Sequence, residues 1–166
     1  MSILPGKYFS LEEFEKDGPV PPDCLPALTE LCQGVLDPSR DWAGCALIVT
    51  SGYRPPDANA AAHGQSNSEH MYSRDWAAAD FYPADGKVRP LFDWMRLNPA
   101  LPFHELILEH GANGSSVIHA SWNRQKAGMR SVLEGATHNA EPYAKVDYVA
   151  FGGNHEAVQA AATGEA

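Results

Sequence analysis

Residues 105–122 read ELILEHGANGSSVIHASW, and this stretch decides the fold that we expect for the chain. Two runs of strand length, residues 105–109 and 116–122, flank a connection that contains two glycines, which is typical of a β-hairpin. Because side chains alternate along a strand, every second residue shares a face. If the two strands pair, Glu109 and His119 point into the same cleft.

Helical patterns dominate the first part of the chain. The tetrapeptide Ser10-Leu11-Glu12-Glu13 is a capping-box pattern, so a short helix is expected to begin there. A second helix is expected to begin at Pro21-Pro22 and to end at Asp37-Pro38, because a residue that precedes proline disfavours the helical conformation. Apolar residues at helical spacing predict a third, amphipathic helix at residues 88–95.

Strand patterns come later in the sequence, at residues 45–50 and 77–82 and in the hairpin. Helices followed by strands favour an α+β fold over a regular alternation of strands and helices. We therefore expect a small antiparallel sheet packed against N-terminal helices. The prediction places one domain at residues 1–151 and a flexible C-terminal tail at residues 152–166.

Composition and charge exclude several classes of function. A chain of 166 residues suits one domain with a hydrophobic core, and a net charge of −9 argues against a nucleic-acid partner. No apolar run approaches the ~20 residues that span a bilayer, so membrane insertion is not expected. The first residues lack the pattern of a secretory signal, which predicts synthesis in the cytoplasm.

The cysteines are odd in number and lack close spacing. Free thiols in a reduced compartment are therefore expected, and a cysteine zinc site is not. We expect a monomer.

Three residues carry the chemistry that zinc requires. Zinc binds imidazole nitrogen and carboxylate oxygen, and a catalytic site keeps its fourth position for water. His70, Asp80 and His119 supply such a set of three ligands, and Glu109 on the neighbouring strand can serve as general base. Taken one at a time, each histidine is more often an ordinary packed or surface residue, so these residues alone leave both interpretations open. His104 and His110 flank the strand of Glu109 and are candidates for contacts just outside the ligands.

A series of short motifs carries a family resemblance. In chain order they are Tyr8-Phe9-Ser10-Leu11-Glu12-Glu13-Phe14, Thr50-Ser51-Gly52-Tyr53-Arg54-Pro55-Pro56, Asn59, Ser68-x-His70, Ala78-Ala79-Asp80 and Ile118-His119-x-Ser121. The chain resembles, over about residues 8 to 125, the superfamily of zinc D-alanyl-D-alanine carboxypeptidases, VanX-type dipeptidases, L-alanyl-D-glutamate endolysins and the Hedgehog signalling domain.

The resemblance implies roles for particular residues. His70, Asp80 and His119 become the zinc ligands, and Arg54 becomes the clamp for a carboxylate or carbonyl of the substrate. Ser68 either hydrogen-bonds the substrate or orients its loop. The implied cofactor is Zn²⁺, and the implied substrate is the stem peptide of peptidoglycan in the cell wall, as for a phage lysin or virion component. Whether the cut falls at a peptide terminus or inside the peptide stays open, and a cytoplasmic recycling peptidase is the alternative.

The chain departs from the family pattern in two places. Relatives usually place the aspartate seven positions after the first histidine, whereas Asp80 follows His70 by ten. We interpret this as a three-residue insertion, with Asp75 as the alternative ligand. Many relatives carry Glu or Asp three positions before the last histidine, where this chain has Ser116.

The second departure leaves the base to the preceding strand. We expect Glu109 to be the general base, with Glu105 as its alternative. These departures keep two other hypotheses open: a zinc-stabilised cell-wall-binding module without turnover, and a structural component of a phage virion.

Overall fold

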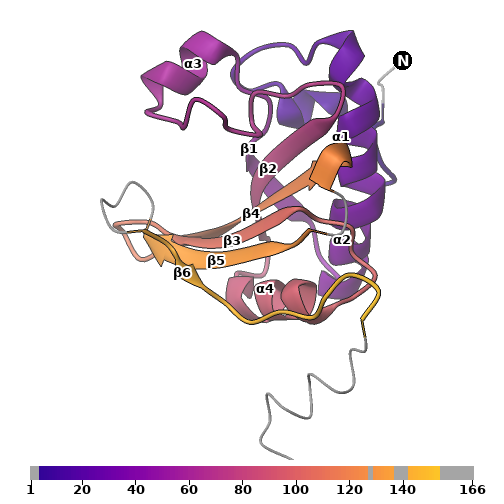
Figure 1. Cartoon of the computed structure of the whole chain (residues 1–166), viewed down its shortest axis with the longest axis vertical. Helices are drawn as coiled ribbons and strands as arrows, with labels where there is room; N and C mark the ends of the chain where they lie inside the picture. Colours follow the sequence, from indigo (N-terminus) through magenta and orange to yellow (C-terminus); the bar gives the residue numbers. More distant parts are fainter. Residues whose placement is uncertain (1–3, 127–128, 137–141, 154–166) are drawn as a thin grey trace, which may run out of the picture.

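The computed structural model describes residues 4–126, 129–136 and 142–153. These residues form a mixed α+β domain around a six-stranded sheet of order β1-β2-β4-β3-β5-β6 (Figure 1). The strands are β1 (Leu47–Ser51), β2 (Trp76–Pro83), β3 (Glu105–His110), β4 (Ser116–Asn123), β5 (Ser131–Ala136) and β6 (Ala144–Lys145). The predicted α+β class is confirmed, and β3 and β4 form the expected antiparallel hairpin.

One strand pair differs from the antiparallel sheet that we predicted. β5 runs parallel to β3, while the other neighbouring strands are antiparallel. β4 ends beside the start of β3, and β5 begins at this same end of the sheet, on the other side of β3. A strand that begins at this end runs in the direction of β3.

The helices are three 3₁₀ turns, one π-helical segment and four α-helices within the described residues. They are η1 (Leu11–Phe14), η2 (Pro22–Cys24), α1 (Leu25–Leu31), the π segment η3 (Cys32–Leu36), α2 (Asp37–Ala43), α3 (Pro56–Ala61), α4 (Val88–Leu97) and η4 (Arg124–Lys126). The capping box of Ser10 and Glu13 begins η1 as predicted.

The prediction that the second helix ends at Asp37-Pro38 is wrong. Helical structure continues from α1 through η3 and α2 and ends at Gly44, which has φ 66 in the left-handed region that glycine accepts. Proline breaks an α-helix because it lacks the N–H that bonds four residues back. The π-helical turns of η3 change that spacing just before Pro38, which lets the helix pass through the proline.

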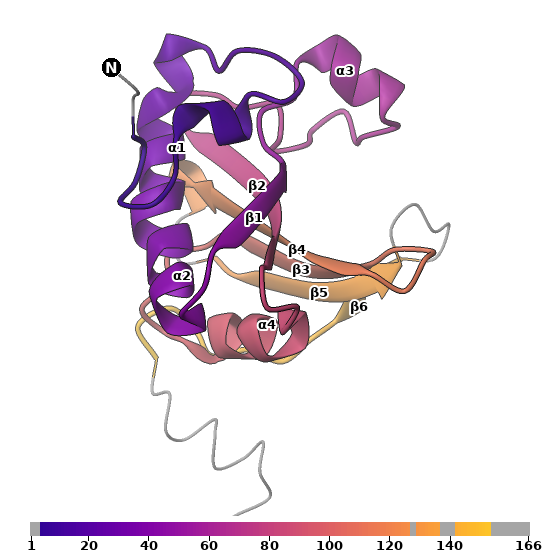
Figure 2. The ribbon, with the colours of Figure 1, turned by 180° about the vertical axis from the view of Figure 1, so that it is seen from behind.

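The two faces of the sheet have different roles. One face is apolar and packs against α1 and α4, which lie along the sheet and at its end (Figures 1 and 2). Its buried side chains include Ala77, Ala79, Phe81, Leu106, Leu108, Ile118 and Ala120. Because side chains alternate, Asp80 on β2 and His119 on β4 lie on the opposite face, away from these helices.

Two sequence predictions concern the limits of the fold. No helix within the described residues is both long and apolar enough to cross a bilayer. The predicted tail at residues 152–166 lies, from residue 154 onward, outside the described residues.

Candidate metal centre

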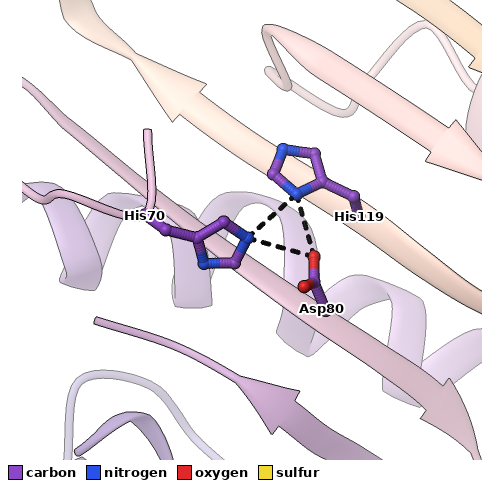
Figure 3. Close-up of side chains that lie close together, drawn as sticks. All are labelled: His70, Asp80 and His119. Atoms are coloured by element: carbon purple, nitrogen blue, oxygen red, sulfur yellow. Dashed lines mark hydrogen bonds and ion pairs between the residues drawn. The ribbon is translucent and has the colours of Figure 1, made fainter. Parts of the chain in front are cut away.

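Three side chains from distant parts of the sequence converge on the open face of the sheet (Figure 3). Asp80 and His119 are directly opposite each other on β2 and β4, and His70 comes from the loop before β2. His70 Nε2 lies 3.1 Å from Asp80 Oδ1 and 3.2 Å from His119 Nδ1, and Asp80 Oδ1 lies 2.9 Å from His119 Nδ1. The two rings are buried, with 4% and 7% of their residues' surfaces exposed.

The segment after β1 fixes the His70 ring. His70 Nδ1 donates a hydrogen bond to the carbonyl of Gly52 at 2.8 Å, and the Arg54 amide donates to the carbonyl of His70 at 2.8 Å. Gly52 must be a glycine, because a Cβ there would lie 2.5 Å from Phe14 Cα. The close packing of Gly52 on Phe14 therefore fixes the position of the carbonyl that orients the His70 ring.

Glu69 ties the same loop to the sheet. His104 Nδ1 lies 3.0 and 3.2 Å from the two carboxylate oxygens of Glu69, and Asn123 Nδ2 donates to the carboxylate at 2.7 Å. Burial alone would raise the pKa of Glu69, but hydrogen bonds from His104, Ser121 and Asn123 lower it to about 2. The ionised carboxylate thus holds the residue next to His70 against β3 and β4.

The three converging atoms fit a divalent metal ion. Since His70 Nδ1 gives its hydrogen to Gly52, the Nε2 of a neutral ring carries a lone pair. That lone pair faces the carboxylate oxygen of Asp80, which has no hydrogen to donate, so the arrangement requires a cation: a ring proton or a metal ion. Ligands of a tetrahedral zinc at ~2.0–2.1 Å lie about 3.3 Å apart, which is close to the separations seen here. Two imidazoles and one carboxylate are also a donor set that zinc accepts.

The charges and hydrogen bonds of these side chains favour positive charge beside Asp80. Burial alone would raise the pKa of Asp80, but the charge of His70 and the hydrogen bond with His119 hold it well below its usual range. Burial alone would lower the pKa of His119, but the hydrogen bond to Asp80 and nearby carboxylates on β3 raise it to about 9. Each shift favours a negative carboxylate beside a positive partner, which is the role that a bound cation fills.

The two glutamates of β3 flank the site differently. Glu105 and Glu109 lie on either side of Ile107, whose partner across the hairpin is His119. Glu105 Oε1 lies 3.5 Å from His119 Nε2, the ring nitrogen that faces away from Asp80. A carboxylate in that place orients a ligating histidine. Glu109 Oε1 instead lies 3.4 Å from the hydroxyl of Tyr143.

Arg54 and Ser68 both lie on the segments that carry His70. The Arg54 guanidinium donates to Ser51 Oγ at 3.0 Å and lies 3.9 Å from Asp17, with 17% of its side chain exposed. Ser68 Oγ accepts a hydrogen bond of 3.3 Å from the His70 amide. The Ser68 hydroxyl therefore shapes the turn before His70.

Asp75 does not join the two histidines. Its carboxylate lies 3.4 Å from Arg124 Nε and accepts from Gln125 Nε2 at 3.4 Å. The Asp75 carboxylate thus lies apart from the two histidines, and Asp80 is the aspartate that the structure brings to them. Ser116, three positions before His119, pairs through its Oγ with His110 Nδ1 at 2.8 Å.

Two residues at the site were absent from the sequence predictions. Glu69 lies beside a predicted ligand, but its role depends on contacts with β3 and β4 that no local motif signals. Tyr143 follows the last recognised motif. His104, predicted to contact the surroundings of the ligands, does so through Glu69.

Comparison with known families agrees with this geometry. Residues 7–121 match the model of the Peptidase M15 family, and this match covers well over half of the chain. The chain therefore belongs to the Peptidase M15 family, a family of metallopeptidases. Comparisons with curated proteins and with solved structures gave no significant match.

Proposed function

We propose that the chain is a zinc peptidase that hydrolyses amide bonds in peptidoglycan stem peptides and acts on the cell wall. The observation that carries the proposal is the convergence of His70 Nε2, Asp80 Oδ1 and His119 Nδ1 within 3.2 Å of one another. Membership of the Peptidase M15 family supports the reaction class. The identity of the metal as zinc, the peptidoglycan substrate and the roles of the individual residues are what we propose.

In this proposal the three residues hold the ion, and Glu105 orients His119. A zinc ion bound there would polarise the scissile carbonyl and lower the pKa of water toward ~7. Glu109 accepts a proton from the attacking water and returns it to the leaving amine as the carbon–nitrogen bond breaks. The products are a carboxylic acid and an amine, so the atoms of one water molecule balance the reaction.

Arg54 is proposed to bind a carboxylate or carbonyl of the substrate. Its backbone amide bonds the carbonyl of His70, so an oxygen bound by the side chain would keep a defined position relative to the ligands. A guanidinium suits this task because it donates two parallel hydrogen bonds to paired oxygens.

The experiment is digestion of purified peptidoglycan by the full chain with and without a chelator, with the fragments identified by mass. Zinc-dependent release of stem-peptide fragments is the expected result, and the fragment masses tell endopeptidase from carboxypeptidase cleavage. Asp80→Asn should abolish the release, while Asp75→Asn, a matched change in the same loop region, should not. Binding to peptidoglycan without any cleavage would instead support a zinc-stabilised binding module.

A further inference from the structure

The part of the chain that follows the family match adds two strands beside the proposed base. The match ends at residue 121, whereas β5 and β6 extend the sheet beyond β3. Gly135 on β5 is the register partner of Glu109 on β3. Residues outside the matched region therefore border the site.

Gly135 makes room for an aromatic ring next to Glu109. A Cβ on Gly135 would lie 2.1 Å from Tyr143 Cδ1 and 2.9 Å from its Cε1, so the ring occupies the space that any other side chain would fill. Glycine inside a strand often marks such a close approach. From this position the Tyr143 hydroxyl lies 3.4 Å from Glu109 Oε1.

Strand pairing sets the position of Tyr143. It immediately precedes β6, where Ala144 pairs with Glu134 and Lys145 pairs with Leu133. The Val146 amide then donates to the carbonyl of Val132 at 2.9 Å. Backbone bonds on the C-terminal side of Tyr143 thus hold the ring against β5.

The hydroxyl of Tyr143 is a donor at neutral pH. Burial, followed by the charge of Glu109, raises the pKa of Tyr143 to about 12. The charges of Asp80 and Glu105 contribute to the same rise. A protonated phenol beside an ionised carboxylate can only donate to it.

We propose that Tyr143 is a positioning residue for Glu109: its hydroxyl hydrogen-bonds the carboxylate and holds it toward the metal ligands. The proposal rests on the proposed function, in which Glu109 is the general base. A glutamate side chain has several rotatable bonds, so a donor at one oxygen restricts where the other oxygen points. Gly135 contributes to this arrangement because it leaves space for the Tyr143 ring.

The test measures kcat and KM of the full zinc-loaded chain on a synthetic stem pentapeptide of mixed L and D residues. A hydrogen bond to a charged group corresponds to at least about a tenfold effect, so Tyr143→Phe should lower kcat about tenfold, with KM changed less than about twofold. Zinc content should stay at one ion per chain. Gly135→Ala, whose methyl group displaces the ring, should reproduce the loss.

The double variant Tyr143→Phe/Glu109→Gln separates positioning from other roles. Tyr143 acts through Glu109, so the double variant should be no slower than Glu109→Gln alone. Full kcat in Tyr143→Phe, or a further tenfold loss on the Glu109→Gln background, overturns the inference while leaving the proposed function intact. Full activity in Glu109→Gln, or no cleavage by the wild-type chain, overturns the proposed function and this inference with it.

Discussion

Asp80 and His119 face each other across the β2–β4 pair, and Asp80 Oδ1 lies 2.9 Å from His119 Nδ1. Direct opposition on neighbouring strands fixes both side chains by the backbone hydrogen bonds of the sheet. The loop before β2 then brings His70, which precedes His119 by 49 positions, next to this pair. Two of the three proposed ligands are therefore placed by the sheet, and the third by a loop.

Metal binding should stabilise the chain through this pair. A ligand that binds only the folded state at 1,000 times its Kd adds about 4 kcal/mol of stability, so saturating Zn²⁺ should raise the Tm of the wild-type chain by several degrees. Asp80→Asn should lose most of the shift, whereas Asp75→Asn should keep it. Thermal unfolding with and without a chelator provides the measurement, and an equal shift in both variants would contradict the assignment.

Gly52→Ala should weaken both the fold and the site. The added methyl group would lie 2.5 Å from the backbone of Phe14, and overpacking of this kind costs about 1–3 kcal/mol. The shifted segment also carries the carbonyl that orients His70. We expect a lower free energy of unfolding in urea for the metal-free variant and a lower affinity for zinc.

Gly86→Ala is the control for the glycine substitution. Gly86 has φ 76 and open space around it, so alanine there is strained only by its own backbone, at about 1–2 kcal/mol. It should leave zinc affinity unchanged. A loss of affinity in Gly86→Ala as large as in Gly52→Ala would argue against a specific role of the Gly52 carbonyl.

Glu69 should make the stability of the chain depend on acid pH. Its folded pKa of about 2 lies below the ordinary value of 4.5, so the folded state favours the ionised form. The stabilisation is fully present above about pH 4.5 and is lost as the pH falls toward about 2. The free energies of unfolding of the wild-type chain and Glu69→Gln should therefore approach each other as the pH falls from 6 to 2.5. A difference that stays constant over this range would contradict the prediction.

Replacing each of the two glutamates of β3 should impair a different property of the chain. Glu109→Gln removes the proposed base, so kcat should fall about 10²- to 10⁴-fold while zinc stays bound. Glu105→Gln removes the carboxylate that faces His119 Nε2, so zinc affinity should fall about 10- to 100-fold. Zinc affinity and kcat measured for both variants decide the matter, and the reverse pattern would exchange the two roles.

Local patterns predicted much of the fold. Strands with period-two alternation and turn residues at their ends, as in residues 105–122, fix their own pairing because a one-residue slip would turn Glu109 and His119 onto the apolar face of the sheet that packs against the helices. The same alternation placed both residues on the open face. The α+β class followed from the order of these patterns.

Other features depend on contacts that the sequence does not display. The helix passes through Pro38 because π-helical turns precede it, and such turns have no local signature. The direction of β5 depends on the end of the sheet at which β4 finishes. Within the site, the contact of Asp75 with Arg124 and the grouping of Asp80 with the two histidines both depend on the folded structure.

Anomalous diffraction at the zinc edge from crystals of the zinc-loaded full chain would locate the metal ion directly. We expect a single peak about 2.0–2.1 Å from His70 Nε2, Asp80 Oδ1 and His119 Nδ1. Zinc density at another group of residues, with none among these three atoms, would contradict it.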